Sequence, residues 1–201
     1  VEDQHFILDT FEGDLELKVF GAHNMSNLEG ARWICNQMGL NDEEFYEAIE
    51  EFEGASKRLE KMDIAVDYDI YRDFAHAPSK VKASVSGTKE TYGDKKLVAV
   101  FELHTFSSLS INFISQYKSS LDTADTAIVY YNPKVLAHKK LPPLDAISVK
   151  EAFGNPNIEV ITDREELIST IKNKGASADV LLLMSSGNFD AINWKEELIK
   201  G

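Results

Sequence analysis

The sequence predicts an α/β fold: a doubly wound, mostly parallel sheet preceded by a β-hairpin and two helices. Strand-like and helix-like segments alternate from about residue 63 to residue 200, which is typical of parallel strands joined by crossover helices. The segment 179–186, DVLLLMSS, is apolar enough for a strand that is buried on both faces. Residues 6–20 instead alternate apolar and polar side chains around a central glycine, as a hairpin does.

The first 57 residues are expected to hold the hairpin and the two helices. The hairpin turns at Glu12-Gly13-Asp14. Apolar residues at helical spacing predict a first helix that ends at Gly39: Leu28, Ala31, Cys35 and Met38. Asn41 is suited to cap a second helix that Gly54 ends, with a buried face made of Phe45, Ala48, Ile49 and Phe52. Residues 55–60, ASKRLE, are interpreted as a linker.

The following residues are expected to form the sheet and its helices, in the order of a Rossmann-like domain. Strands are predicted at 63–74, 95–103, 126–132, 158–162 and 179–186. One helix should present Val81, Val85, Thr88 and Tyr92 to the core, and the next Leu109, Phe113, Tyr117 and Leu121. Further helices are predicted at 148–153, at 163–175 with Asp163 as cap and Gly175 as stop, and at 194–200.

The composition excludes several classes of protein. The chain has 21 Lys and Arg against 34 Asp and Glu, a formal charge of −13, and no basic cluster compensates, so nucleic-acid binding is not expected. No apolar run is long enough to cross a bilayer and no signal-peptide pattern is visible. We therefore expect a cytoplasmic protein without a membrane partner. Cys35, the single cysteine, lies in an apolar run and is predicted to be a buried structural thiol.

The sequence lacks the short motifs of several enzyme classes. It contains no phosphate-binding GxxxxGK[ST] loop, no GxGxxG, no HExxH and no GxSxG. The segment SGTKET, 86–91, has no glycine before its lysine and lies in a helical stretch. Without a cysteine pair or HExxH, a self-contained zinc site is not expected.

Polar groups gather instead in loops. The carboxyl ends of parallel strands are where such sheets bind ligands, and these ends read RDFAHAP, ELHTFSS, YYNPK and MSSGNFD. Asn24 and Asn27 lie three residues apart at a helix start, and their amides suit an adenine edge because they donate and accept together. On the pattern alone, a helix cap by Asn24 or Ser26 is the simpler interpretation.

The other polar candidates also have two interpretations. Arg58 would suit a ribose or a phosphate, although a single Arg in a linker is usually only solvated. Asp73 and His76 would suit a nucleotide, or they would cap the helix that begins near Pro78. His104 follows a buried strand in a polar loop, which is a less ordinary place for a histidine than an apolar face.

Five segments, in this order, resemble the Mur ligase family, which builds peptidoglycan precursors. They are GAHNMSN (21–27), FEGASKRLE (52–60), DFAHAPSKVKA (73–83), VAVFELHTFSS (98–108) and LLLMSSGNFDAI (181–192). Each segment is a weak signal alone, but five in the family's order are fairly specific, and the resemblance extends over nearly the whole chain.

The resemblance implies a division of the chain. Residues 1–57 would be the end of the family's central ATP-binding domain, and residues 58–201 the C-terminal Rossmann-like domain. The family's phosphate loop and magnesium ligands would lie upstream of this chain, in the missing N-terminal and central domains. We therefore expect no ligase activity from this chain alone, and a hinge near residues 54–60.

The resemblance also implies roles for particular residues. Asn24 and Asn27 would face the adenine of ATP with His23 beside them, Arg58 and Asp73 would hold the ribose and phosphates, and His76 would lie close by. Two departures from the family are visible. Arg72-Asp73 stands where the family often has two aspartates, and Ala77 stands where it often has a second histidine.

Two strand-end loops are predicted to form the pocket for the incoming peptide. Their residues are His104, Thr105, Ser107 and Ser108 in one loop and Ser186, Gly187 and Asn188 in the other. The branch of the family that adds a single L-alanine usually has arginines where this chain has Thr105 and Ser108. The resemblance is therefore nearest to the branch that joins L-alanyl-γ-D-glutamyl-meso-diaminopimelate to UDP-N-acetylmuramate.

Two alternatives remain at this stage. One is the alanine-adding branch of the same family. The other is a stand-alone Rossmann-like module that binds a nucleotide or a peptide without catalysis.

Overall fold

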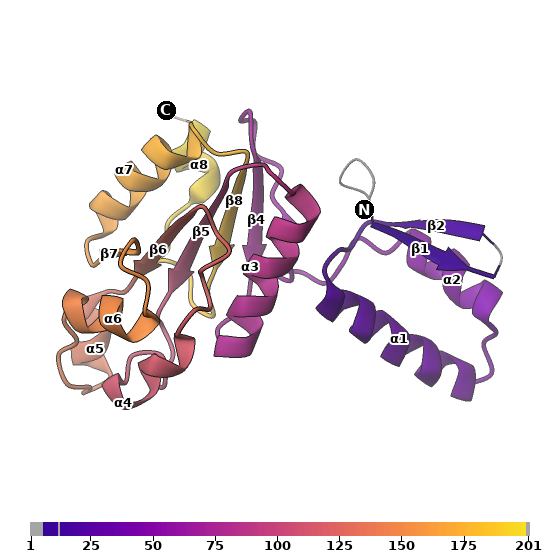
Figure 1. Cartoon of the computed structure of the whole chain (residues 1–201), viewed down its shortest axis with the longest axis horizontal. Helices are drawn as coiled ribbons and strands as arrows, with labels where there is room; N and C mark the ends of the chain where they lie inside the picture. Colours follow the sequence, from indigo (N-terminus) through magenta and orange to yellow (C-terminus); the bar gives the residue numbers. More distant parts are fainter. Residues whose placement is uncertain (1–5, 12, 200–201) are drawn as a thin grey trace.

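A computed structural model describes residues 6–11 and 13–199 of the chain. It has a small N-terminal part and a larger C-terminal sheet that lie side by side (Figure 1). The N-terminal part contains β1 (Phe6–Thr10), β2 (Gly13–Leu17), α1 (Ala22–Gln37) and α2 (Asp42–Glu50). β1 and β2 pair antiparallel, with Phe6 opposite Leu17, which confirms the hairpin. The predicted turn position was wrong for Gly13 and Asp14, which lie in β2 and pair with β1; Glu12 lies outside the described residues.

A six-stranded sheet in the order β3-β4-β8-β5-β6-β7 forms the C-terminal part. The two-residue β3 is antiparallel to β4, and all the other pairs are parallel. The predicted α/β class with a mostly parallel sheet is therefore confirmed. The strands are β3 (Glu60–Lys61), β4 (Asp69–Asp73), β5 (Leu97–Glu102), β6 (Thr126–Tyr130), β7 (Glu159–Ile161) and β8 (Val180–Met184).

Helices cover both faces of this sheet (Figure 1). One face packs against α3 (Pro78–Tyr92), α4 (Ile111–Ile114), the 3-10 helix η1 (Ser115–Tyr117), α5 (Pro133–His138) and α6 (Ala146–Phe153). The other face packs against α7 (Arg164–Gly175) and α8 (Trp194–Ile199).

The central strands have no polar face because both of their faces are covered. In β8, Leu182 and Met184 pack on the α3 side, whereas Leu181 and Leu183 pack on the α7 side. Each of these side chains is almost completely buried, so residues alternate between two apolar layers. The sequence of β8, VLLLM, is uniformly apolar because both of its faces are buried.

Several local predictions are confirmed by the structure. Asn41 caps α2 in a capping box with Glu44, in which each side chain bonds the other residue's backbone N–H. Asp163 caps α7 by accepting from the backbone N–H groups of Glu165 and Glu166, both at 3.0 Å. Pro78 stands at the start of α3, where its missing N–H is harmless.

Predictions about the first two helices need correction. α1 starts at Ala22, so Asn24 and Ser26 lie inside the helix and the cap interpretation was wrong for both. The buried face of α2 is narrower than predicted, because Ala48 is exposed and Phe52 is 44% exposed. Cys35 is half-buried beside a small cluster, not fully buried.

The sheet region also differs from the prediction in places. The predicted strand 63–74 is only β4, and the predicted helix through Leu109 and Leu121 is reduced to α4 and η1. The chain leaves the helical conformation at Lys118, which follows η1 with ψ of 129°. Ser119 then has φ of 60° and donates its N–H to Phe153 O at 3.0 Å. α5 was not predicted, and the last residue of the predicted helix 194–200 lies outside the described residues.

Candidate functional site

A cavity of about 700 Å³ lies at the junction between the N-terminal part and the sheet. Helices α1 and α2 line one side, and the end of β4 and the first turns of α3 line the other. It brings together residues that are far apart in the sequence, among them His23, Asn24, Asn27, Arg58 and Asp73. We call this space the junction cavity.

A pair of glycines lets α1 approach α3 closely. Gly21 has φ of 90°, a conformation that L side chains rarely adopt. A Cβ added to Gly87 of α3 would lie 3.3 Å from the Cα of Gly21. Next to this contact, Phe20 packs edge-on against Tyr71 with ring centroids 5.3 Å apart. The start of α1 is thereby held against the sheet domain.

The two asparagines of α1 keep hydrogen-bonding capacity for a ligand. Asn24 donates its side-chain N–H to Phe20 O at 2.8 Å, and its side-chain oxygen accepts no hydrogen bond from the described residues. Asn27, one turn along, is exposed and has no hydrogen-bond partner in the described part of the chain. Both amides line the junction cavity.

His23 lines the junction cavity, with its ring close to Gly21 and Gly87. Partial burial lowers the pKa of His23 below 6.5, the nearby charge of Asp73 opposes this shift, and Lys80 reinforces it. The ring therefore favours the neutral form at pH 7, in which one nitrogen donates and the other accepts.

Arg58 and Asp73 face the junction cavity from the C-terminal part. The guanidinium of Arg58 lies 5.6 Å from the centroid of the Phe74 ring and has no ion pair in the described residues. Asp73 is buried; it accepts from Ala75 N at 3.2 Å and from the Ser84 hydroxyl. The cation is therefore available to a ligand, whereas the carboxylate is held in place by its own neighbours.

The structure separates His76 from the other five candidates. Its Nδ1 lies 2.9 Å from Phe74 O, and its ring packs edge-on against Phe74. Its backbone carbonyl accepts from the Tyr117 hydroxyl, and it does not line the junction cavity. The N-cap of α3 is Ala77, without a side-chain cap, so the cap interpretation was wrong for Asp73 and for His76.

Lys80 and Ser84 also line the junction cavity and were not found by sequence reasoning. They are one turn apart on α3, next to the core residues Val81 and Val85. The spacing of four residues was visible in the sequence, but only the position of α1 against α3 shows that this face is lined with candidate ligand-binding groups.

A buried carboxylate connects the two loops that were predicted to bind peptide. Glu102, at the end of β5, is 2% exposed and accepts from the Ser185 hydroxyl and from Phe189 N at 2.9 Å. The other carboxylate oxygen lies 3.6 Å from His104 Nδ1. A Cβ at Gly187 would lie 2.7 Å from the His104 ring, so His104 and Gly187 are in direct contact.

The remaining residues of these loops mostly bond to their own neighbours. Thr105 Oγ1 lies 3.1 Å from Ser107 Oγ and donates to Ser108 Oγ at 2.9 Å. Ser108 is 1% exposed, so it contributes little surface to a pocket. In the other loop, Asn188 accepts from Ala191 N at 3.2 Å, and the buried Ser186 hydroxyl has no partner in the described residues.

Glu102 was missed in the sequence although a signal existed. It is a single acidic residue in the otherwise apolar strand LVAVFE. A carboxylate in such a place needs several donors, and its donors come from residues more than eighty positions away.

Among the described residues, no group of three or more His, Cys, Asp or Glu side chains could hold a metal ion. Within the same residues, no helix is long and apolar enough to cross a membrane.

Comparisons with known proteins agree with the fold. A family model described as "Mur ligase, glutamate ligase domain" matches residues 57–187. The UDP-N-acetylmuramate–L-alanine ligase of Sulfurihydrogenibium sp. is 27% identical over 90% of this chain and 40% of its own length. The same-named ligase of Paenarthrobacter aurescens is 27% identical over 94% of this chain and 40% of its own length. The chain thus spans about two fifths of these curated relatives.

Two solved structures are similar over almost the whole chain. The UDP-N-acetylmuramate–alanine ligase of Thermotoga maritima matches 93% of this chain and 39% of its own, with a TM-score of 0.69 and 21% identity. A murein peptide ligase from Psychrobacter arcticus matches 96% of this chain and 40% of its own, with a TM-score of 0.63 and 21% identity. At this identity the two structures support the fold alone.

Proposed function

The chain belongs to the Mur ligase family, and from that premise we propose that it is the C-terminal part of an ATP-dependent ligase. The full-length enzyme joins L-alanyl-γ-D-glutamyl-meso-diaminopimelate to UDP-N-acetylmuramate, as in peptidoglycan recycling. The observation that supports this proposal best is the junction cavity, which gathers His23, Asn24, Asn27, Arg58 and Asp73.

The junction cavity suits the adenosine end of ATP. Its walls combine apolar side chains with the two asparagine amides, which fits a flat base with donor and acceptor edges. The guanidinium of Arg58, which has no ion pair in the described part of the chain, suits a phosphate or a ribose. When bound, ATP supplies the phosphoryl group that activates the carboxylate of UDP-N-acetylmuramate for attack by the amine of the peptide. This chain's residues orient the nucleotide and exclude water from it.

The division of the chain is part of the proposal. Residues 1–57 end a central ATP-binding domain, and residues 58–201 form the C-terminal domain. In support, α1 presents Trp33, Ile34 and Met38 to solvent, an apolar face that favours contact with further protein surface. As the family resemblance implies, the magnesium ligands are proposed to lie upstream of this chain in the full-length enzyme.

The segment 54–60 is the proposed hinge between the two domains, and Glu60 fixes its present position. The Glu60 carboxylate accepts from Arg72 at 2.8 and 3.0 Å and from Lys57 N at 2.6 Å. These bonds, chiefly the pair with Arg72, lower the pKa of Glu60 to about 2. The carboxylate is therefore ionised at neutral pH. When the two domains move about segment 54–60, the hydrogen bonds from Arg72 and Lys57 N to Glu60 are either kept or broken.

The choice of tripeptide as acceptor is supported by Thr105 and Ser108. The alanine-adding branch usually has arginines at these two places, and here a small, uncharged turn takes their place. The alternative is UDP-N-acetylmuramate–L-alanine ligase activity, which is favoured by the names of the curated relatives.

The test compares the two acceptors directly. The purified full-length protein is incubated with ATP, magnesium, UDP-N-acetylmuramate and either the tripeptide or L-alanine, and phosphate release and ligated product are measured. We expect product with the tripeptide and little with L-alanine. Product with L-alanine alone would support the alternative branch. A gene without an upstream phosphate loop would instead support the stand-alone binding module.

A further inference from the structure

Arg58, which lines the junction cavity, lies between two residues with an unusual backbone conformation. Lys57 has φ of 57° and Leu59 has φ of 46°. Residues other than glycine rarely adopt such values, and they keep them only where the surrounding structure holds the backbone in place. The direction in which the Arg58 side chain leaves the chain therefore depends on the contacts of its two neighbours.

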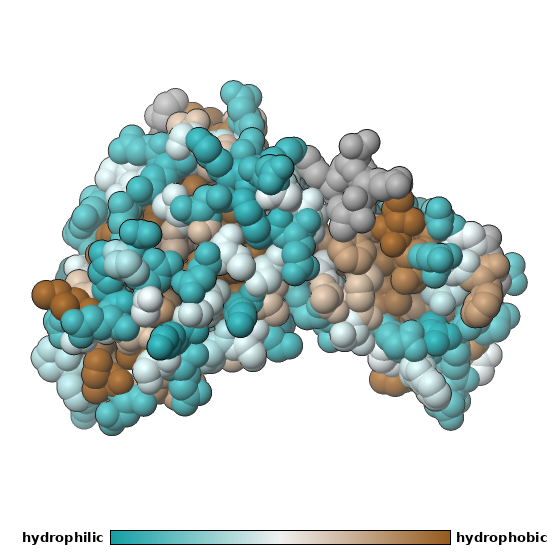
Figure 2. Space-filling view, in the orientation of Figure 1, coloured by the Kyte–Doolittle hydropathy of each residue, from teal (hydrophilic) through white to brown (hydrophobic). Residues whose placement is uncertain are grey.

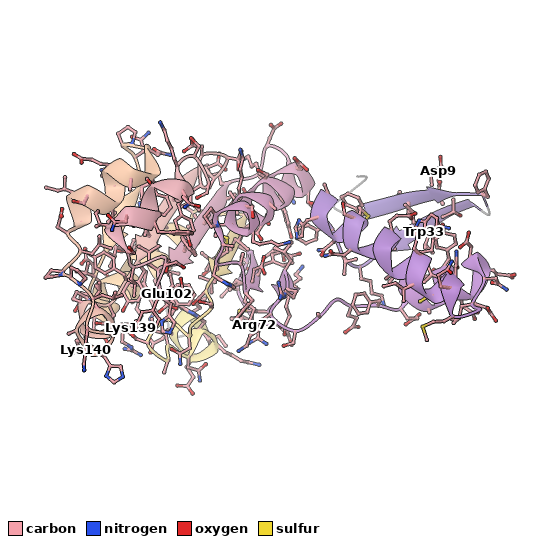
Figure 3. All side chains as sticks on the ribbon, turned by 90° about the horizontal axis from the view of Figure 1, so that it is seen from below. Asp9, Trp33, Arg72, Glu102, Lys139 and Lys140 are labelled. Carbon is pink, nitrogen blue, oxygen red and sulfur yellow. The ribbon has the colours of Figure 1, made fainter. Side chains whose placement is uncertain are left out.

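The carboxylate of Glu60 holds the backbone of Lys57. Its Oε2 accepts from Lys57 N at 2.6 Å and from Arg72 Nε at 3.0 Å, and its Oε1 accepts from Arg72 Nη2 at 2.8 Å. Such a bidentate pair fixes the orientation of both groups as well as their separation. Arg72 lies opposite Glu60 in the β3–β4 pair, and Figure 3 shows it where the linking segment reaches the sheet domain. We call Glu60, Arg72 and the Lys57 N–H the hinge clamp.

Further contacts tie the same residues to the sheet domain. Lys57 O accepts from Phe74 N at 2.7 Å, so both backbone groups of Lys57 are bonded. Leu59 is 8% exposed and packs in the apolar cluster under α3. The Arg58 guanidinium lies 5.6 Å from the centroid of the Phe74 ring. Arg58 is therefore fixed to the sheet domain and moves with it when the two domains move about segment 54–60.

The hinge clamp affects the position of Arg58 more than the stability of the fold. The side chains of Arg72 and Glu60 are 39% and 33% exposed, and ion pairs as exposed as this add little to the free energy of unfolding. Among the described residues Arg58 has no ion pair of its own, so its position depends on its backbone and on the Phe74 ring. The clamp is also particular to this chain, because the aspartate that the family often has in place of Arg72 would repel Glu60.

We propose that Glu60 and Arg72 are positioning residues for the nucleotide. By fixing the backbone of Lys57, they hold the Arg58 guanidinium over Phe74, where it reaches the phosphate or ribose of a nucleotide in the junction cavity. This inference rests on the proposed function, because it takes a nucleotide to be the ligand of that cavity. Neither Glu60 nor Arg72 lines the junction cavity, so both act through Arg58 and not by contact with the ligand.

The position of Arg58 can be measured by NMR on the 201-residue chain without a ligand. Because the Arg58 side chain lies over the Phe74 ring, its signals should carry a ring-current shift. Arg72→Gln removes the bidentate bonds and should move these signals toward the values of an unstructured arginine. Arg72→Lys keeps the charge but not the fork of donors, so it should give an intermediate shift. Arg164→Gln is the matched control, because it breaks an Arg–Glu pair on α7 that has no part in the junction cavity.

A nucleotide titration then shows whether the hinge clamp acts through Arg58. ATP with magnesium is added to the unmodified chain, to Arg58→Gln, to Arg72→Gln and to the double variant, and the side-chain amide signals of Asn24 and Asn27 are followed. We expect Arg58→Gln to weaken ATP binding by about tenfold and Arg72→Gln by about threefold. In the double variant the Arg72 change should weaken binding no further, as expected for two residues that act as one unit.

Either of two results overturns the inference. One is a set of Arg58 signals that Arg72→Gln leaves unchanged. The other is an effect of Arg72→Gln on ATP binding that persists in full when Arg58 is already glutamine. Failure of the proposed function has a different signature: ATP would shift neither the Asn24 nor the Asn27 amide of the unmodified chain. The ligand-free signals of Arg58 would still decide whether the hinge clamp positions its guanidinium.

Discussion

The sheet domain and the N-terminal part differ sharply in how much apolar surface they bury. Both faces of the sheet carry extended apolar clusters under helices. In the described N-terminal residues, the buried cluster consists of Leu17, Leu28 and Phe45. On α1, Trp33, Ile34 and Met38 are 62%, 64% and 75% exposed. Figure 2 shows apolar residues gathered on the N-terminal part, beside a mostly hydrophilic face of the sheet domain.

The two regions therefore contribute differently to stability and to the candidate ligand site. The sheet domain buries most of the apolar residues in the described part of the chain, and burial of apolar surface is the main favourable contribution to stability. The N-terminal part contributes His23, Asn24 and Asn27 to the junction cavity, yet it has little core to hold them. The position of these side chains therefore depends on the contact between α1 and α3. The following four changes test this view, from the largest expected effect to the smallest.

A core truncation in each region should give the sharpest contrast. Leu182 is 0% exposed at the centre of β8, so Leu182→Ala should lower the free energy of unfolding by about 3 kcal/mol. Ile34→Ala, on the exposed face of α1, should change it by less than about 0.5 kcal/mol. Urea unfolding of both variants measures the difference. Equal losses would contradict the contrast between the two regions.

Removal of the buried carboxylate tests the polar part of the sheet domain. Glu102→Ala leaves Phe189 N and the Ser185 hydroxyl without their acceptor. We expect this change to lower the free energy of unfolding by about 2 kcal/mol. Glu102→Gln keeps an acceptor oxygen and should lower the free energy of unfolding by less. Glu151→Ala, at an exposed position on α6, serves as the control. A thermal-unfolding series that ranks the Gln and Ala variants equally would refute the role of the accepting oxygen.

A bulky residue at the contact between the two regions should detach α1 without unfolding the sheet. A side chain at Gly87 meets Gly21 Cα and the His23 ring, so Gly87→Leu should raise hydrogen exchange at α1 amides by about tenfold, or about 1.4 kcal/mol. Amides of β5 and β8 should keep their protection. Gly30→Leu is the matched control, because Gly30 lies on α1 with open space around it. A rise in exchange throughout the sheet would show that the regions do not open separately.

The titration of His23 should give the smallest effect. Its pKa is lowered by burial below 6.5, so below pH 6.5 the unfolded chain binds this proton more readily than the folded chain. The contribution of neutral His23 to the free energy of unfolding is fully present above pH 6.5. It decreases as the pH falls below 6.5, by less than about 1 kcal/mol. His23→Gln should therefore lose less stability than the unmodified chain between pH 7.5 and 5.5. An identical loss in both chains, measured by thermal unfolding, would exclude His23 as a contributor.

Apolar periodicity predicted most of the fold, and its failures have local causes. The buried strand at 179–186 and the capped helix at 163–175 were visible because each has a strong pattern and clear ends. α5 has only six residues, too few for a helical period to show. Residues 109–121 have a helical pattern, but the chain leaves the helical conformation at Lys118, and the next residue, Ser119, bonds to Phe153 O.

The candidate site was predictable only in part. Five residues of the junction cavity were found through the family resemblance, although on pattern alone Asn24 would have been taken for a helix cap. Lys80 and Glu102 were not found, because their surroundings depend on which elements pack together. Ser108 was predicted as pocket lining, and it is buried in its own turn.

The most direct test of the account is a titration of the isotope-labelled 201-residue chain with adenosine and with ATP and magnesium, followed by NMR. We predict weak binding of both, with a Kd on the order of 1 mM, because the chain has adenosine-side groups and no phosphate loop. The shifted signals should include the side-chain amides of Asn24 and Asn27 and the backbone of Arg58 and Asp73. Micromolar binding of ATP, or shifts confined to residues outside the junction cavity, would contradict the assignment.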